Sequence, residues 1–228
     1  MKKDDIITLK IEDLSTEGLG IGHSEGLALF VKDTVIGDVA EVKIMKMKKN
    51  YGYARLLRLL SASPDRIEAP CPVARPCGGC QIQEMRYDAQ LRFKEQKVRS
   101  NLQRIGGFVN PPMEPIIGMD SPFRYRNKAQ YPIARDKEGN LTAGFYAGRT
   151  HTVIDCRDCL LGASVNKIIL DIVLSHMETC HIQPYDEATG KGLVRHVMIR
   201  VGSEVLRREC NPGVERGAAD GESSPDAE

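Results

Sequence analysis

Three cysteines lie within a short stretch of the chain, at Cys71, Cys77 and Cys80, and their spacing is the clearest chemical signal in the sequence. A Cys-x-x-Cys pair directs two thiols toward one small centre, and Gly78 and Gly79 allow backbone N–H groups to approach those sulfurs. Prolines interspersed with the cysteines disfavour a helix here. Such a cluster is typical of a metal or iron–sulfur site, and its three ligands require a fourth from elsewhere.

A second Cys-x-x-Cys pair, Cys156 and Cys159, offers the missing ligand. Zinc is one possibility, because paired Cys-x-x-Cys motifs suit tetrahedral thiolate sites. A zinc site built from the two pairs would leave Cys71 without a role, and its halves lie much farther apart than in the usual zinc ribbon. An iron–sulfur centre would use Cys71 as well. From the spacing alone, either Cys156 or Cys159 can be the fourth ligand.

The elements that precede the cysteines read as β-structure. Over residues 6–60, short runs of alternating apolar and polar residues are separated by glycine-containing turns, of which the one at 17–22 is the richest in glycine. Strands of this number and length predict a small closed barrel of the oligonucleotide-binding type. The expected strands are 7–11, 27–31, 39–44 and 51–60.

The end of this β-region is cationic. Between positions 43 and 58 there are six basic residues and no acidic one, and Tyr51 and Tyr53 lie among them. The basic residues are Lys43, Lys46, Lys48, Lys49, Arg55 and Arg58. Because basic groups follow phosphates and aromatic rings stack on bases, this composition predicts an RNA-binding edge. The contacts are expected from Lys46, Lys48, Lys49 and Tyr51. The alternative is a solvated hairpin whose lysines protect a strand edge.

The rest of the chain mixes helices and strands. Residues 61–70 form a linker by composition. Apolar residues at helical spacing predict helices at 85–105 and 165–177, with a further strand from 194. The expected apolar stripe of the first helix is Tyr87, Leu91, Val98, Leu102 and Ile105. That of the second is Val165, Ile168, Ile169, Ile172, Val173 and His176.

Residues 123–132 alternate strictly and predict a strand with one cationic face. A strand whose polar side chains are long and cationic suits contact with phosphates. We therefore expect Arg124, Arg126 and Lys128 to bind RNA. A turn at 136–140 and a return strand at 141–155 follow.

Composition bounds the class of protein. The net charge of +1 conceals an asymmetry, since residues 209–228 are strongly acidic and the preceding chain is mildly basic. No apolar run approaches the ~20 residues that a membrane span requires, and the amino terminus lacks a signal-peptide core. Seven cysteines are an odd number, and without a secretion signal a disulfide framework is not expected. The chain is predicted to be cytoplasmic.

The order of motifs resembles a known family. The first region resembles a TRAM domain, an RNA-binding barrel, through Glu17-Gly18-x-Gly20, Phe30-Val31, Gly37-Asp38 and Lys46-x-Lys48-Lys49. The later motifs are Cys-x5-Cys-Gly-Gly-Cys-x-x-Gln at 71–83, Gln90-Leu91-x-x-Lys94, Phe123-Arg-Tyr-Arg-Asn-Lys, Gly144-Phe-Tyr and Arg195-His-Val-Met-Ile-Arg. Taken together, the chain is similar to the 23S ribosomal RNA (uracil-5-)-methyltransferases that carry a 4Fe–4S cluster.

The resemblance implies an α+β fold in two parts. A TRAM-like barrel of the OB type would occupy residues 1–60, and a small iron–sulfur α/β domain that recognises RNA would occupy 61–202. The polar segment 203–228 is expected to be a disordered tail. The resemblance also implies that the 4Fe–4S cluster is held by Cys71, Cys77, Cys80 and Cys159.

In that family a carboxy-terminal Rossmann-like domain binds S-adenosylmethionine, and its cysteine attacks C6 of a flipped uracil. After residue 202 the sequence has neither the length nor the glycine-rich turn for such a domain. We therefore expect a truncated chain that recognises 23S ribosomal RNA, contains no catalytic residues and is not catalytic alone. Cys210-Asn211-Pro212 matches the family's nucleophile loop only briefly and is interpreted as chance. The alternative function is a non-enzymatic RNA-binding module with a structural zinc or iron–sulfur site.

Overall fold

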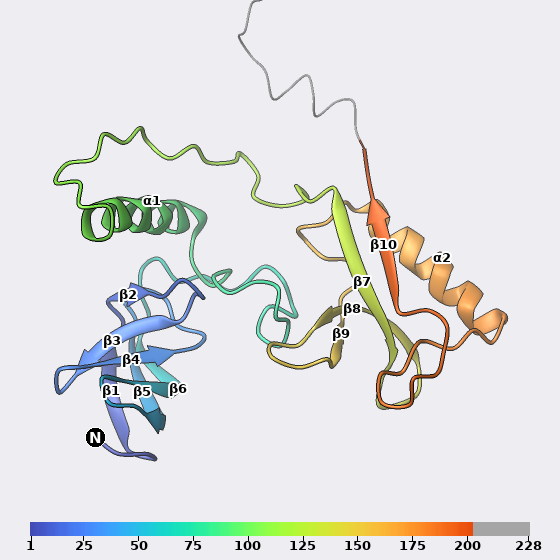
Figure 1. Cartoon of the computed structure of the whole chain (residues 1–228), viewed down its shortest axis with the longest axis horizontal. Coiled ribbons are helices and arrows are strands. Elements are labelled where there is room, and N and C mark those ends of the chain that lie inside the picture. Colours follow the sequence, from blue (N-terminus) through green and yellow to red (C-terminus); the bar gives the residue numbers. More distant parts are fainter. Residues whose placement is uncertain (203–228) are drawn as a thin grey trace, which may run out of the picture.

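The computed structural model describes residues 1–202, which form two β-sheets and two helices in an α+β arrangement (Figure 1). The predicted disordered tail, 203–228, and Cys210 lie outside the described residues. No helix in the described part of the chain is long and apolar enough to cross a membrane.

The amino-terminal sheet has six strands in the order β1-β5-β6-β4-β3-β2. They are β1 (Ile6–Lys10), β2 (Asp13–Leu14), β3 (Gly20–Ser24), β4 (Leu27–Val31), β5 (Val39–Met47) and β6 (Tyr51–Ser61). The sheet curls until β3 lies against β1. Gly22 permits this approach, because a Cβ atom there would collide with the Lys10 carbonyl oxygen. The result is the barrel-like sheet that the alternation predicted, and we call it the barrel (Figure 1).

Alternating apolar residues fill the barrel. The interior consists of Leu9, Ile11, Leu29, Val31, Ala40, Val42, Ile44 and Ala54. Register shifts between β5 and β6 mark irregularities that bend these long strands, as bulges do. The strands predicted at 27–31, 39–44 and 51–60 are confirmed. Residues 20–22, which were expected in a turn, belong to β3, because Gly20 and Gly22 serve close packing inside the barrel rather than chain reversal.

Helix α1 (Tyr87–Arg104) lies close to the predicted 85–105. It meets the barrel at a small cluster of buried residues, formed by Leu14, Val35, Met85 and Ala89. The apolar stripe expected for this helix is only partly covered, since Tyr87, Leu91 and Leu102 are half-buried. Val98 is 51% exposed and Ile105 is 84% exposed, and Ala89 is the one residue of α1 that is buried. The first half of the helix therefore docks on the barrel, with Leu91 and Phe93 half-buried, whereas Val98 and Ile105 farther along are exposed.

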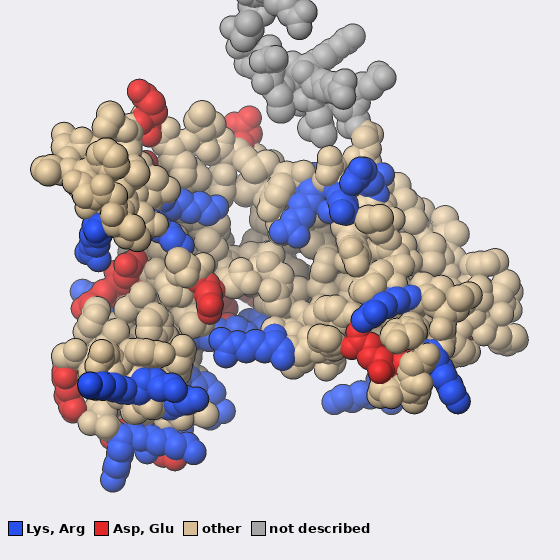
Figure 2. Space-filling view, in the orientation of Figure 1, with Lys and Arg blue, Asp and Glu red and all other residues tan. Residues whose placement is uncertain are grey.

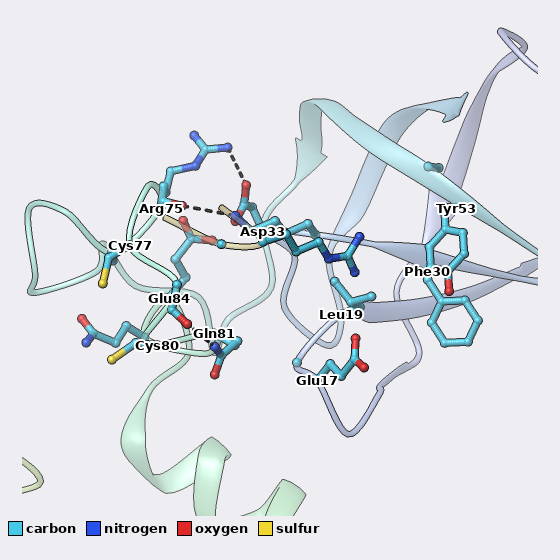
Figure 3. Close-up of a pocket in the computed structure, with 18 residues that line it drawn as sticks. Glu17, Leu19, Phe30, Asp33, Tyr53, Arg75, Cys77, Cys80, Gln81 and Glu84 are labelled. Carbon is cyan, nitrogen blue, oxygen red and sulfur yellow. Dashed lines mark hydrogen bonds and ion pairs between the residues drawn. The ribbon is translucent and has the colours of Figure 1, made fainter. Parts of the chain in front are cut away.

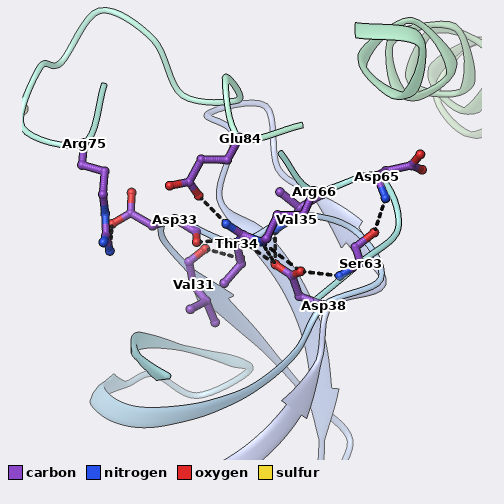
Figure 4. Close-up of polar contacts among 10 residues, drawn as sticks. All are labelled: Val31, Asp33, Thr34, Val35, Asp38, Ser63, Asp65, Arg66, Arg75 and Glu84. Atoms are coloured by element: carbon purple, nitrogen blue, oxygen red, sulfur yellow. Dashed lines mark hydrogen bonds and ion pairs between the residues drawn. The ribbon is translucent and has the colours of Figure 1, made fainter. Parts of the chain in front are cut away.

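Residues 61–70 are not the free linker that their composition predicted. The Asp38 carboxylate is fully buried, and it accepts hydrogen bonds from the backbone N–H groups of Val35, at 2.7 Å, and Ser63, at 2.9 Å. The Arg66 guanidinium pairs with it at 2.6 Å and with Glu84 at 2.8 Å (Figure 4). A buried charge needs such partners, so this segment is fixed to the barrel.

The second sheet has four strands in the order β10-β7-β8-β9, and helix α2 packs on it (Figure 1). Its elements are β7 (Lys128–Arg135), β8 (Leu141–Tyr146), β9 (Val153–Asp155), α2 (Val165–Thr179) and β10 (His196–Arg200). The core between sheet and helix consists of Ala129, Tyr131, Ile133, Ala143, Leu170, Leu174, Met177 and Ile199. The strand expected at 123–132 begins only at Lys128, and the return strand expected at 141–155 is divided into β8 and β9.

Helix α2 is present where it was predicted, but most of the expected stripe is not the buried face. Ile168 is 61% exposed and Ile172 is 63% exposed, whereas Leu170, Leu174 and Met177 are buried against the sheet. The helix is apolar on more than one side, so spacing alone could not identify the face that the sheet covers.

The buried Asp38 carboxylate generates a test of this fold. Asp38→Asn removes the charge while keeping an oxygen acceptor, and it leaves the half-buried Arg66 guanidinium with one ion-pair partner, Glu84. Breaking a buried pair in this way is expected to lower the free energy of unfolding by about 3 kcal/mol, measured by urea denaturation. The matched control is Glu41→Gln, which breaks the exposed pair with Arg58 and should cost less than about 1 kcal/mol. Equal losses in the two variants would contradict the central role of Asp38.

Candidate metal centre and nucleic-acid surface

The two cysteine groups meet at one small cavity. Cys71, Cys77 and Cys80 lie in the loop between β6 and α1, whereas Cys156 and Cys159 follow β9. All five line the same cavity. The remaining lining residues are Ala74, Gly79, Gln83, Arg126, Phe145, Leu160 and Leu161. The structure thus brings together the four ligands expected from the sequence and the alternative fourth ligand.

Strand β8 holds both cysteine groups in place. At its end, the Tyr146 carbonyl accepts a hydrogen bond from the Gly78 N–H at 3.0 Å. In its middle, the Ala143 carbonyl accepts one from the Cys156 N–H at 3.1 Å. Gly78 fits this contact because a Cβ atom there would lie only 3.0 Å from the Tyr146 carbonyl oxygen. Cysteines that are distant in the sequence are therefore aligned by one strand.

Burial and local donors act in opposite directions on the loop thiols. Burial raises the pKa of Cys77 and that of Cys80. The Gly79 N–H lies 3.4 Å from the Cys77 sulfur, and the Gln83 side chain donates to the Cys80 sulfur, and both contacts lower the pKa. Burial prevails and the pKa of both thiols is raised overall, while the donors beside the sulfurs partly offset it in favour of the thiolate, the form in which cysteine binds metals.

In the second cysteine pair, the Cys156 thiol donates a hydrogen bond and the Cys159 sulfur accepts it. A hydrogen bond from the Cys156 thiol lowers the pKa of Cys159, and the backbone N–H groups of Leu161 and Gly162 act in the same direction, so that the pKa falls to about 6 in spite of burial. The same contact raises the pKa of Cys156, which is also buried. Of these two side chains, Cys159 is therefore the one that carries the negative charge.

The donor set around the cavity is entirely sulfur. Phe145, Leu160 and Leu161 give the cavity an apolar wall. Thiolates are soft ligands that select zinc or iron–sulfur centres, so the chemistry of these residues fits such a group. Within residues 1–202, no three His, Cys, Asp or Glu side chains converge closely enough to hold a single metal ion.

The cationic edge of the barrel is smaller than its sequence suggested. Lys43 pairs with Asp4 at 2.9 Å, and Arg58 pairs with Glu41 at 3.1 Å, so neither is free for phosphate. The other cations of this edge form no ion pair with any described residue. They are Lys46, Lys48, Lys49 and Arg55.

An aromatic cluster lies beside this edge. The rings of Phe30, Tyr51 and Tyr53 contact one another with centroids 5.7–5.8 Å apart, and each tyrosine is 37% exposed. Phe30 joins the cluster because β4 pairs in parallel with β6, which sets Phe30 opposite Tyr53. Sequence reasoning did not assign Phe30 to this surface, because a parallel pairing between distant strands has no local signal.

A cleft of about 600 Å³ separates the barrel from the cysteine loop. Figure 3 shows Phe30 and Tyr53 at one end of it and Cys77 and Cys80 at the other. Arg75 lies between them and pairs with Asp33 at 3.3 Å. The cleft thus connects the aromatic cluster with the outer side of the cysteine loop.

The cationic face expected over residues 123–132 is not formed. Arg124 has a positive φ of 58°, which breaks the alternation, and its guanidinium donates to Asp158 at 2.6 Å and to the carbonyls of Cys159 and Gly162. It therefore holds the Cys159 loop and is not a free phosphate ligand. Arg126 lines the cysteine cavity, and Lys128 alone of the three lies on a strand.

Comparison with known proteins places these features in context. Residues 4–57 match the family model for the TRAM domain. The chain is 44% identical to an uncharacterized RNA methyltransferase of Halalkalibacterium halodurans and 43% identical to one of Bacillus cereus. Each match covers 89% of this chain and 44% of the relative. The chain thus spans less than half the length of the curated relatives that it matches.

A solved structure shares the fold. The tRNA (uracil-54, C5)-methyltransferase of Pyrococcus abyssi, determined in complex with S-adenosyl-L-homocysteine, superposes with a TM-score of 0.59 at 22% identity. The match covers 85% of this chain and 42% of that protein. The barrel and the second sheet therefore occur together in a longer methyltransferase.

Proposed function

We propose that this chain is the RNA-recognition part of an S-adenosylmethionine-dependent RNA (uracil-5-)-methyltransferase. The observation that carries the proposal is the continuous match, over 89% of the chain, to proteins named RNA methyltransferases. The TRAM match at residues 4–57 and the fold shared with a tRNA uracil methyltransferase support the same class. A non-enzymatic RNA-binding module has no comparable support from these relatives.

In this proposal the barrel edge binds RNA. Lys46, Lys48 and Lys49 are free of ion pairs with described residues, and they lie beside the exposed ring of Tyr51. Free cations provide phosphate contacts, and exposed aromatic rings provide surfaces on which unpaired bases stack.

The proposed group at the cysteine cavity is a 4Fe–4S cluster held by Cys71, Cys77, Cys80 and Cys159. The all-sulfur donor set, the apolar wall and the donors beside the sulfurs support this choice. Cys156 is the most buried of the five cysteines and donates to Cys159, which suits a supporting role. A bound cluster would cross-link the loop before α1 to the segment after β9.

Methyl transfer itself is proposed for the whole protein. It requires a bound donor and a nucleophile positioned at the uracil ring, and the matched relatives are more than twice as long as the matched region. S-adenosylmethionine is accordingly the proposed cofactor of the longer protein. We propose 23S ribosomal RNA as its substrate, on the resemblance of the motifs.

The metal content tests the proposed centre. Protein purified without oxygen is expected to be brown and to contain about four iron atoms per chain. Cys71→Ser, Cys77→Ser, Cys80→Ser and Cys159→Ser should each lose the visible absorption, whereas Cys156→Ser should retain it. Cys180→Ser is the matched control, because this exposed thiol lies outside the cavity. Colourless protein with stoichiometric zinc would refute the assignment, as would loss in Cys156→Ser but not in Cys159→Ser.

The salt dependence of RNA binding tests the barrel edge. Replacing Lys46, Lys48 and Lys49 together by Gln should reduce the slope of log affinity against log salt by about 2, since each contact to single-stranded RNA contributes roughly 0.7. Arg124→Gln is the comparison variant, and its slope should equal that of the wild type because its guanidinium is already engaged. If the triple variant kept the wild-type slope, the edge would not contact phosphates.

The nucleoside content of cellular RNA tests the proposed reaction. A bacterial strain that lacks the full-length protein should lose 5-methyluridine from 23S ribosomal RNA, detected by mass spectrometry of digested RNA. Complementation with the full-length gene should restore it. Loss from transfer RNA alone would move the substrate to transfer RNA, and unchanged 5-methyluridine in both RNAs would overturn the proposed activity.

A further inference from the structure

One face of the four-stranded sheet is covered by α2, and the other face is exposed at the end where β7 begins and β10 ends. Ala129, Tyr131 and Ile133 of β7 point to the core that α2 covers. Because side chains alternate along a strand, the residues between them point the other way. We call this second surface the open face. On β7 and β10 its exposed residues are Lys128, Gln130, Met198 and Arg200, whereas Pro132 is buried and Ala134 and His196 are half-buried.

The strand register sets two cations directly opposite each other on this face. Lys128 of β7 pairs with Arg200 of β10, and Gln130 pairs with Met198. Lys128 and Arg200 are both exposed, and neither forms an ion pair with a described residue. No acidic residue belongs to the open face on these two strands. Figure 2 shows basic side chains gathered where β7 begins and β10 ends.

This pairing is unfavourable in the absence of a ligand. Like charges directly opposite each other destabilise a pair of antiparallel strands. At several other exposed positions the chain pairs a cation with an acid, as in Arg58 with Glu41 and Lys167 with Asp171. An anion between Lys128 and Arg200 would turn the repulsion into two favourable contacts, and a phosphate group has the oxygens to accept both.

The centre of the open face is apolar. Met198 is 61% exposed and lies opposite Gln130, two residues from the cationic pair along each strand. A polarizable thioether next to a hydrogen-bonding amide can contact the face and the edge of an unpaired base. Within one nucleotide a charged phosphate is followed by an aromatic base. The cationic pair next to Met198 and Gln130 presents complementary groups in the same order.

We infer that the open face of β7 and β10 is a second RNA-binding surface, on which a backbone phosphate of single-stranded RNA lies between Lys128 and Arg200. This inference deepens the proposed function and rests on it, since it names where the RNA continues beyond the barrel edge. The register between the strands carries it: Arg200 stands opposite Lys128 although the two are far apart in the sequence.

The test uses the full chain, purified without oxygen, and a single-stranded RNA oligonucleotide of ribosomal sequence. Lys128→Gln and Arg200→Gln should each lower the slope of log affinity against log salt by about 0.7, and the double variant by about 1.4. Met198→Ser should weaken binding without changing the slope. Lys137→Gln is the control, because this exposed lysine lies in the turn after β7 and away from the open face. It should bind as the wild type does.

A second measurement shows whether the variants fold and whether the repulsion is real. Without RNA, either single variant should have a higher Tm than the wild type at low salt, and the gain should vanish at high salt as screening removes the repulsion. A double variant with the wild-type affinity and slope would overturn the inference. If replacing Lys46, Lys48 and Lys49 together by Gln still weakened RNA binding while the double variant did not, the proposed function would stand without this second surface. If the wild-type chain did not bind RNA, both the inference and the proposed function would be refuted.

Discussion

The buried carboxylate of Asp38 is the constraint on which the relative placement of the functional parts depends. A fully buried charge is tolerated only where donors surround it, and here the donors come from two segments: Val35 in the barrel turn, and Ser63 and Arg66 in the segment after β6. Arg66 then reaches Glu84, on the far side of the cysteine loop. Both ends of that loop are thus fixed to the barrel by one ionic network.

This network fixes the cysteine loop beside the barrel. The cleft between them is lined by Tyr53 on one side and Cys77 on the other, and its width follows from where Arg66 holds the chain. The opposite side of the loop is fixed by β8 through Gly78. The cysteine cavity therefore lies at the junction of the two sheets, where a cross-link between thiols has the greatest effect on their relative position.

The sequence predicted the parts of the structure that depend on local patterns. The convergence of the cysteines, the strand Leu27–Val31 and both helices were predicted from spacing and alternation. The predictions that failed concern features that depend on contacts with residues distant in the chain. The position of the sheet determines which face of α2 is buried. Ile168 and Leu170 are both large and apolar, and the sequence of the helix alone does not show that Leu170 is the buried one.

Arg124 and Arg200 illustrate the same limit for function. Strict alternation assigned Arg124 to a cationic strand face, but its positive φ turns the side chain to Asp158 and to the carbonyls of the Cys159 loop. Arg200, which alternation gave no reason to single out, acquires a role only through the register of β10 on β7. Apolar periodicity is a property of one segment, whereas a charged surface is a property of the pairing between segments.

These placements suggest why a metal centre would belong in an RNA-recognition module. The barrel edge and the open face lie on different sheets, and in the proposed function each would offer only a few phosphate contacts, too few for tight binding at physiological salt. Two weak surfaces bind one strand tightly only if their separation is held constant, because the second contact then forms at a high effective concentration. Asp38 and Arg66 fix the loop to the barrel, and β8 with the cysteine cavity fixes it to the second sheet. In this arrangement a cluster would act on RNA affinity through geometry, without touching the RNA.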